Sequence, residues 1–287
     1  MSKPIILVTG EKGQLGSELK VLSKSYPQYD YVFTDVDELD ITDAEKVEEF
    51  FITYKPAICI NAAAYTAVDK AETDKELALK INAYAVGNLA ENCRKRNTRF
   101  IHVSTDYVFD GTATSPYTED HPVSPVNFYG ESKLKGEEIA LEKLPSTVII
   151  RTSWVYSYFG NNFVKTMLRL MKERENINVI NDQFGSPTYA ADLAEVIMQI
   201  AEQTENKGGI YHFSNEGIIS WFDFAIAIKE LAGLRCNVQP IDTSGYPTPA
   251  KRPAYSAMSK EKIKSVFDIK LKDWKNSLQQ CIHLLQQ

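Results

Sequence analysis

Tyr129 and Lys133 stand four residues apart in the stretch NFYGESKLKGEE, at the start of a helix predicted over 127–143. Residues with this spacing share one face of a helix. A tyrosine exchanges protons poorly at neutral pH because its ordinary pKa is about 10. We expect the neighbouring ammonium to lower the pKa of the phenol, as proton exchange with a carbonyl or an alcohol requires. The pair alone fits a packed aromatic beside a solvated lysine equally well, so its surroundings decide.

Those surroundings alternate between strands and helices, which predicts an α/β fold with a Rossmann-type, doubly wound parallel sheet. Strands are expected at 4–9, 30–34, 57–61, 99–104 and 146–151, with helices at 14–25, 43–54, 72–96 and 127–143. The remainder is less regular. It predicts a smaller, mixed α/β substrate-binding domain.

A glycine-rich turn joins the first strand to the first helix. The stretch VTGEKGQLGSEL places Gly10, Gly13 and Gly16 there, with Lys12, Gln14 and Leu15 around them. Such a turn can aim backbone N–H groups and a helix N-terminus at a pyrophosphate, and Gly16 allows the helix to pack closely on the strand. The glycines alone also fit an ordinary tight turn.

The ends of the next two strands favour a dinucleotide. Asp35 ends the second strand 19 residues after Gly16, close to the distance expected for an acid on the adenosine ribose. The acids around Asp35 favour NAD over NADP, but Lys12 leaves a 2′-phosphate open, so both NADH and NADPH remain candidates. Asp40 and Ile41 follow, with Ile41 expected against the adenine. Small residues Ala62, Ala63 and Ala64 would let a ribose and phosphates approach the third strand.

The fourth strand ends in Ser104, Thr105 and Asp106, at the sheet edge where ligands of such folds bind. We expect Thr105 to donate a hydrogen bond to a substrate oxygen while Tyr129 transfers the proton. Lys133 also holds the ribose next to the nicotinamide, and Ser104 lies beside the cofactor. The predicted units are an NAD(P)-binding domain over 1–152 and a mainly substrate-binding domain over 153–287. The strand and helix within 176–205 are expected to pack back onto the first unit.

Composition excludes several other classes. The 287 residues are 44% hydrophobic, enough for two cores, and a net charge of −6 argues against nucleic-acid binding. No apolar stretch approaches the roughly 20 residues of a membrane span, and the chain starts without a signal-peptide pattern, so the cytoplasm is expected. The four cysteines and four histidines lack metal-ligand spacing, and no metal site is predicted from them.

The chain resembles the extended short-chain dehydrogenases/reductases, and within them the dTDP-4-dehydrorhamnose reductases. The motifs that carry the resemblance are GEKGQLGSEL, NAAAYTAVDKAE, STDYVFDG, SPVNFYGESKLKGE, RTSWVYSYFGNNFVKTML, NDQFGSPTYAADLA and YPTPAKRPAYS. The resemblance implies a catalytic triad of Thr105, Tyr129 and Lys133. It also implies reduction of the C4 ketone of dTDP-4-dehydro-β-L-rhamnose to dTDP-L-rhamnose by NAD(P)H, the last step of dTDP-rhamnose biosynthesis.

The resemblance further implies a dTDP-sugar site where the two domains meet. The matching positions are Thr66, Val68, Asp106, Tyr107 and Trp154, with Arg252 expected at the diphosphate. Tyr107 and Trp154 also fit as core aromatics. Some of these reductases form magnesium-dependent homodimers through acidic residues. Glu18 matches one such position and Asp192 matches less clearly, so Mg²⁺ and a homodimer stay open.

Three alternatives are weighed against this interpretation. A nucleotide-sugar dehydratase typically needs a glutamate directly after Thr-Asp, where this chain has Tyr107. An epimerase, or a reductase of another nucleotide sugar, is not excluded directly. The regulatory subunit of methionine adenosyltransferase is similar to this family and binds the cofactor without a known need for turnover, but a complete triad argues against a purely regulatory role.

Overall fold

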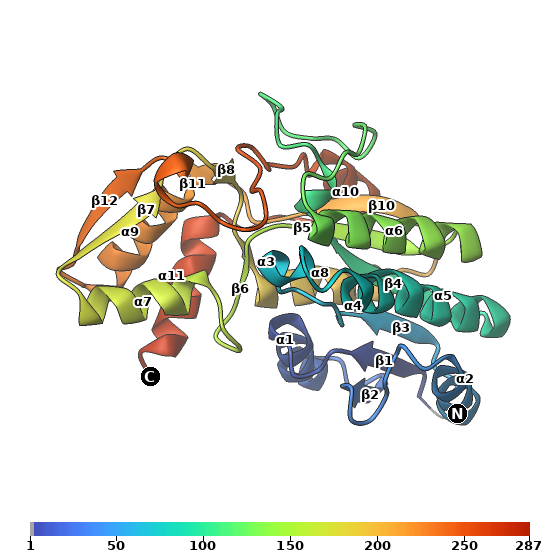
Figure 1. Cartoon of the computed structure of the whole chain (residues 1–287). Coiled ribbons are helices and arrows are strands. Elements are labelled where there is room, and N and C mark those ends of the chain that lie inside the picture. Colours follow the sequence, from blue (N-terminus) through green and yellow to red (C-terminus); the bar gives the residue numbers. More distant parts are fainter. Residues whose placement is uncertain (1–2) are drawn as a thin grey trace.

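The computed structural model describes residues 3–287, so positions 1–2 of the expected first unit lie outside the described residues. Its centre is a six-stranded sheet in the order β10-β5-β4-β3-β1-β2, with every neighbouring pair parallel (Figure 1). The strands are β1 (Ile5–Thr9), β2 (Asp30–Thr34), β3 (Ile58–Asn61), β4 (Arg99–Thr105), β5 (Val148–Thr152) and β10 (Gly209–Phe213). The chain begins at β1, moves to the edge strand β2 on one side, and then returns to build β3, β4, β5 and β10 on the other side, which confirms the predicted doubly wound fold.

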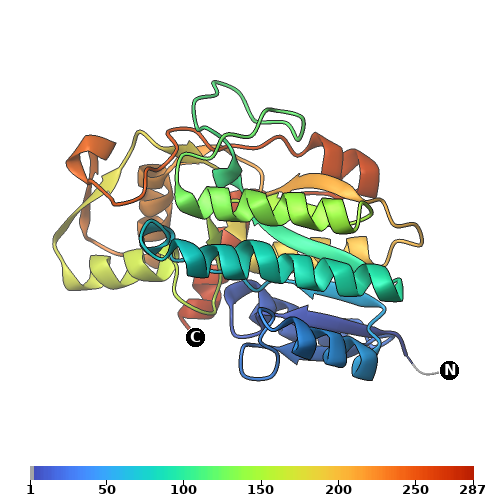
Figure 2. The same ribbon diagram turned by 45° about the vertical axis from the view of Figure 1, so that its right-hand side comes forward.

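Helices cover both faces of this sheet because its strands are apolar on both sides. In β1, Ile6 and Val8 join one core cluster and Leu7 joins the other, as alternation along a strand requires. The Leu7 face carries α2 (Ala44–Tyr54), α5 (Ala85–Arg96) and α6 (Phe128–Lys143). The opposite face carries α1 (Gln14–Leu22), α8 (Ala190–Ala201) and α10 (Glu261–Phe267). Figure 2 shows α5 and α6 running side by side over the sheet.

A further core cluster, separate from the two on the faces of the sheet, forms in the C-terminal half, to the left in Figure 1. It is built from α7 (Phe163–Glu173), β7 (Asn176–Ile180), α9 (Trp221–Ala232), β12 (Asn237–Ile241) and α11 (Trp274–Leu285). Short strands connect it to the sheet: β6 (Val155–Tyr156) pairs with β9 (Thr188–Tyr189), and β8 (Phe184–Gly185) pairs with β11 (Ile219–Ser220). The site residues predicted on the two halves therefore meet along this junction.

The strand within 176–205 does not pack on the first unit, so that part of the prediction is wrong. Strand β7 pairs in parallel with β12, and Ile177 and Val179 join the C-terminal core. Helix α8 does pack against α1 on the large sheet. The two elements separate because β9 and the turn before it carry the chain from one core to the other.

The single helix predicted over 72–96 is interrupted. The chain forms α3 (Val68–Ala71), α4 (Lys75–Leu79), a π-helical turn η2 (Lys80–Tyr84) and then α5. Asn82, fully buried in the π turn, accepts a hydrogen bond from the backbone N–H of Tyr65 at 2.8 Å and donates to Ser132 Oγ at 2.9 Å. These bonds join the loop after β3 to α6, which carries Tyr129 and Lys133.

The short turns complete the chain. They are the 3₁₀ segments η1 (Ser23–Ser25), η3 (Asp106–Val108) and η4 (Thr243–Gly245). The first of these replaces the end of the helix predicted over 14–25. Within residues 3–287, no helix combines the length and the apolar character needed to cross a membrane.

Candidate active site

A cavity of about 1010 Å³ opens at the carboxyl ends of the central strands and extends to the C-terminal core. Most of the predicted site residues line it: Gly10, Gly13, Gln14, Leu15, Asp35, Asp40, Ile41, Ala62, Ala63, Ala64, Thr66, Val68, Ser104, Thr105, Asp106, Tyr107, Tyr129, Lys133 and Trp154. Lys12, Gly16 and Arg252 do not line it. Residues drawn from both halves of the chain thus surround one space large enough for a dinucleotide and a second ligand.

The glycine turn has the shape of a phosphate cradle. Gly10 has a φ of +76°, and a Cβ there would lie 2.7 Å from the backbone nitrogen of Ala63. A Cβ on Gly16 would lie 2.2 Å from the Gly10 carbonyl oxygen, so this glycine acts through close packing and not by lining the cavity. The N-cap of α1, Gly13, offers no side-chain hydrogen bond. The first N–H groups of α1 are therefore available to a pyrophosphate.

The end of β2 carries negative charge toward the cavity. Asp35 accepts hydrogen bonds from the backbone N–H groups of Lys12 at 3.0 Å and Val36 at 2.9 Å. The Lys12 ammonium turns outward instead and pairs with Asp37 at 2.6 Å. Asp40 accepts bonds from Thr42, which hold its pKa below the ordinary range. This end of the cavity suits ribose hydroxyls. Lys12 is the nearby cation for a ribose 2′-phosphate, and it becomes available when its exposed ion pair with Asp37 breaks.

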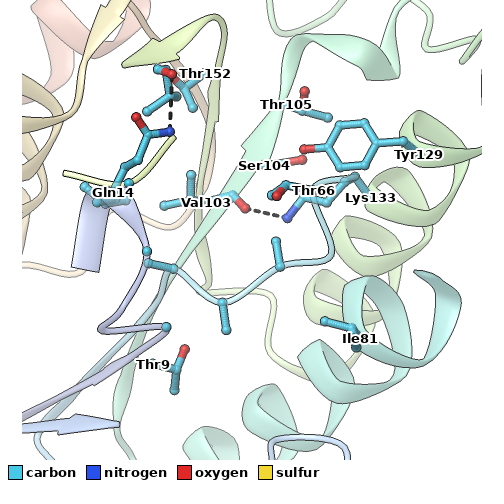
Figure 3. Close-up of a pocket in the computed structure, with 18 of the residues that line it drawn as sticks. Thr9, Gln14, Thr66, Ile81, Val103, Ser104, Thr105, Tyr129, Lys133 and Thr152 are labelled. Atoms are coloured by element: carbon cyan, nitrogen blue, oxygen red, sulfur yellow. Dashed lines mark hydrogen bonds between the residues drawn. The ribbon is translucent and has the colours of Figure 1, made fainter. Parts of the chain in front are cut away.

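Thr105, Tyr129 and Lys133 converge on one wall of the cavity (Figure 3). The Tyr129 hydroxyl points toward Thr105 and Ser104, and Lys133 Nζ donates to the Val103 carbonyl oxygen at 2.7 Å. Thr105 and Lys133 are almost fully buried. The strand end and the helix face thus bring the three side chains together as the spacing predicted.

Two local features set the first turn of α6 against η3. Asn127 caps the helix by accepting the Gly130 N–H at 2.9 Å, and its amide donates to the Lys251 carbonyl at 2.8 Å. A Cβ on Gly130 would lie 2.2 Å from the Tyr107 carbonyl oxygen. Only glycine permits this approach. The contact places Tyr129 beside Thr105, and it also sets the Tyr129 ring edge-on to Tyr107 at 5.6 Å between ring centroids.

The expected lowering of the tyrosine pKa by the lysine is wrong for this structure. Desolvation raises the pKa of Tyr129 to about 12, against the influence of Thr105. Burial lowers the pKa of Lys133 to about 8, and Glu137 opposes that shift. Lys133 directs its Nζ at the Val103 carbonyl, and at Tyr129 the desolvation of the phenol outweighs the lowering of its pKa by Thr105. Tyr129 is consequently a neutral phenol at pH 7.

Asp106 controls the hydroxyl of Thr105. The Thr105 Oγ1 donates to Asp106 Oδ1 at 3.0 Å and accepts the backbone N–H of Tyr107 at 3.2 Å. Burial raises the pKa of Asp106 to about 6, while the nearby hydroxyls of Ser256 and Thr105 oppose that rise, and no group among residues 3–287 makes a hydrogen bond of ordinary geometry to Oδ2. A ligand hydroxyl donated to Asp106 would satisfy that oxygen, which fits its predicted place in the sugar site.

Trp154 and Arg252 are the remaining residues predicted for the sugar-nucleotide site. Trp154 has a φ of +49°, unusual for a bulky residue, and stacks on Trp221 with ring centroids 3.5 Å apart. Arg252 forms an ion pair with Asp69 of α3 at 2.9 Å. This contact holds the loop that carries Arg252 close to Tyr107. Both positions face the junction between the two halves, although Arg252 stops short of the cavity wall.

Sequence reasoning missed several lining residues. They are Thr9, Val36, Leu39, Thr42, Leu77, Lys80, Ile81, Val103, Thr152, Ser153, Val155, Gly160, Asn161, Phe163, Leu193 and Trp221. Thr152 and Ser153 could have been found, because they end β5 as Ser104 and Thr105 end β4. Lys80 and Ile81 sit on the π turn, and Trp221 is distant in sequence, so no local signal marked them.

The two acids considered for magnesium have other partners. Asp192 Oδ1 pairs with the Lys272 ammonium at 2.8 Å, and its Oδ2 accepts from Asn215 at 2.7 Å. Glu18 accepts from Ser157 Oγ at 2.6 Å. These contacts occupy both oxygens of Asp192, so the pair does not offer two free carboxylates to Mg²⁺, and no step of the reaction is assigned to a metal. No group of three or more His, Cys, Asp or Glu side chains suited to a metal lies in the described part of the chain.

Known proteins are similar to this chain along nearly its whole length. The family model described as RmlD substrate binding domain matches residues 4–287. The dTDP-4-dehydrorhamnose reductase of Aggregatibacter actinomycetemcomitans is 44% identical, covering 95% of this chain and 96% of that protein. A crystal structure of a dTDP-4-dehydrorhamnose reductase from Clostridium acetobutylicum matches with a TM-score of 0.95 and 42% identity over 99% of this chain and 100% of that one. The Bacillus anthracis enzyme, in complex with NADP, matches with a TM-score of 0.94 and 39% identity over 98% and 99%.

Proposed function

The chain belongs to the RmlD substrate binding domain family, and from this premise we propose that it reduces dTDP-4-dehydro-β-L-rhamnose to dTDP-L-rhamnose with NAD(P)H. The single observation that carries the proposal is the convergence of Thr105, Tyr129 and Lys133 on one wall of a cavity that the glycine turn also lines. The relatives named as dTDP-4-dehydrorhamnose reductases, one of them in complex with NADP, support the same reaction and cofactor.

Different residues of the site bind different parts of the cofactor. The N–H groups at the start of α1 and the small side chains of Ala62, Ala63 and Ala64 accommodate the pyrophosphate, and Asp35 receives the adenosine ribose. Lys133 is placed for the other ribose. When bound, the nicotinamide supplies the hydride that the sugar carbonyl receives.

The protein's own task is to place the ketone and supply one proton. Tyr129, neutral at pH 7, donates its phenolic proton to the oxygen of the sugar as that oxygen gains negative charge. Thr105 orients the same oxygen after its hydroxyl turns away from Asp106. Thr66, Val68, Tyr107 and Trp154 enclose the sugar nucleotide, and Arg252 meets its diphosphate from the neighbouring loop.

The test is NADPH and NADH oxidation with dTDP- and UDP-linked 4-keto sugars, using the parent protein and Tyr129→Phe. We expect Tyr129→Phe to lower kcat about a hundred- to ten-thousand-fold while NADPH still binds, because only the proton donor is lost. Tyr156→Phe is the matched control. Its hydroxyl is buried without a partner among the described residues and does not line the cavity.

A Tyr129→Phe protein that binds NADPH and turns over within a few-fold of the parent would disprove the assigned role of Tyr129. A parent protein that binds NADPH but reduces none of the sugars would instead support a regulatory role. Preference for a UDP-linked sugar would place the chain among other nucleotide-sugar reductases.

A further inference from the structure

A buried chain of polar side chains crosses the sheet beneath the proposed active site. Thr9 on β1, Asn61 on β3, His102 on β4 and Lys133 on α6 are each at most 2% exposed. Thr9 Oγ1 donates to Asn61 Oδ1 at 2.6 Å, Asn61 Nδ2 lies 3.0 Å from His102 Nδ1, and His102 Nε2 lies 3.5 Å from Lys133 Nζ. Thr9 and Lys133 line the cavity, whereas Asn61 and His102 do not.

The orientation of the Asn61 amide is fixed by a backbone group. The Ala63 N–H donates to Asn61 Oδ1 at 3.2 Å, and a backbone N–H can only donate. The atom that faces Ala63 must therefore be the amide oxygen, and the amide nitrogen must face His102. Turning the amide over would set its N–H₂ against the Ala63 N–H, two donors facing each other, whereas the Thr9 hydroxyl could bond either orientation.

That orientation fixes the tautomer of His102. The Asn61 amide nitrogen can only donate, so His102 Nδ1 must accept, and the proton of the neutral ring resides on Nε2. A doubly protonated ring would set an N–H against the amide N–H₂. Burial also lowers the pKa of His102 well below its ordinary value, with Lys133 contributing. The ring is neutral at physiological pH.

The Nε2–H of His102 consequently faces Lys133 Nζ. An ammonium has only donors, whereas a neutral amine can accept from Nε2–H while still donating to the Val103 carbonyl at 2.7 Å. Glu137, one turn further along α6, favours the ammonium, and this carboxylate is itself paired with the buried Arg151 of β5 at 2.7 Å. The phenol of Tyr129 lies on the cavity side. The imidazole and the carboxylate therefore act on the lysine in opposite senses.

We propose that Asn61 and His102 are positioning residues for Lys133: the amide selects the Nε2–H tautomer, and the ring N–H favours the amine over the ammonium at Lys133. This inference deepens the proposed function, because it concerns a residue assigned there to the active site. Neither Asn61 nor His102 touches the cavity, so they act through Lys133 alone. The cofactor-free protein already contains every group involved.

The first test reads the tautomer directly. The sample is cofactor-free protein labelled with ¹⁵N-histidine. The chain has four histidines, and the signals of His102 are identified because they are missing from the spectrum of His102→Gln. We expect the Nε2–H form in the parent and the Nδ1–H form in Asn61→Asp, because a carboxylate accepts where the amide donated. Asn92→Asp is the control. It adds a buried carboxylate beside Arg96 on α5, away from the site. An Nδ1–H parent, or an Asn61→Asp protein with an unchanged tautomer, overturns the proposal.

The second test measures NADPH affinity against pH by fluorescence titration. In Asn61→Asp the ring would present an acceptor to Lys133, so the pH at which binding weakens on the alkaline side should rise by at least about one unit. Asn92→Asp should leave it in place. The double variant Asn61→Asp/His102→Gln should lose NADPH affinity at the same alkaline pH as the single variant His102→Gln. A persistent rise there would show a charge acting through space and would refute the relay through His102. Neither readout requires turnover, so an inactive parent would disprove the reductase without deciding this point.

Discussion

Replacing Lys133 with methionine should stabilise the cofactor-free protein at neutral pH while it abolishes the reductase. The Lys133 side chain is 2% exposed, and burial lowers its pKa from 10.5 to about 8. A shift of this size corresponds to a destabilisation of about 3 kcal/mol when the lysine is charged in both folded and unfolded states. Methionine fills a similar volume without charge. It loses the bond to the Val103 carbonyl, worth about 1 kcal/mol, so a net gain of about 2 kcal/mol is expected.

The pH dependence separates this effect from ordinary packing. Because the folded pKa of Lys133 lies below the unfolded one, the unfolded chain binds more protons between pH 8 and 10.5. The free energy of unfolding of the parent therefore rises with pH in that window relative to the variant. The destabilisation from Lys133 falls from about 3 kcal/mol at pH 7 to about 1 kcal/mol at pH 10. The stability advantage of Lys133→Met should disappear by pH 10.

The assay is urea unfolding of the parent, Lys133→Met and Lys135→Met at pH 7, 8, 9 and 10. Lys135 is the matched control because it lies on the same helix but is exposed, in an ion pair with Glu138 at 2.9 Å. Its replacement should leave the pH dependence unchanged. If Lys133→Met is less stable than the parent at pH 7 by an amount that does not vary with pH, then desolvation of the ammonium is not a significant term, and the argument for a lysine strained by burial is wrong.

Three further outcomes follow from the site and its support. Asp35→Ala should weaken NADH more than NADPH in direct titration, because ribose hydroxyls lose an acceptor while a 2′-phosphate loses a repulsive neighbour; equal losses would remove Asp35 from the ribose. Arg252→Ala should raise KM for the sugar nucleotide more than KM for the cofactor, and unchanged kinetics would return this residue to its ion pair with Asp69 alone. Glu137→Gln should lower the free energy of unfolding by about 3–5 kcal/mol, since it leaves the buried Arg151 without its carboxylate, whereas the exposed Glu138→Gln should change it by under about 0.5 kcal/mol.

The sheet could be predicted from the sequence because its signals are local. Each of the first five strands is a short apolar run followed by turn residues, and each of these five lies within two residues of its predicted range. The π turn could not be predicted in this way. It depends on Asn82 bonding Tyr65 and Ser132, which are 17 and 50 residues away along the chain. The partner of β7 was missed for the same reason, because parallel pairing with β12 joins segments about 60 residues apart.

The positions of the site residues could be predicted from the sequence, because they follow from strand ends and helical spacing. Their pKa values could not be predicted, because they depend on how each side chain is packed. Strand ends and helical spacing brought Thr105, Tyr129 and Lys133 together, but the sequence argument assigned the wrong direction to the tyrosine pKa. Spacing says that an ammonium is near a phenol. It does not say that the ammonium is buried against Val103, which decides how strongly each group is desolvated.

The direction of the pKa shift at Tyr129 suits reduction. Burial raises the pKa of this phenol to about 12, so at pH 7 Tyr129 holds the acid form that a forming alkoxide needs. A phenolate, which a lowered pKa would favour, is the base for the reverse oxidation. Burial also lowers the pKa of Lys133 to about 8, so we expect Lys133 to lose its proton before Tyr129 as the pH rises. The alkaline limit of the reduction should therefore belong to Lys133, whose surroundings His102, Glu137 and Val103 set from three sides.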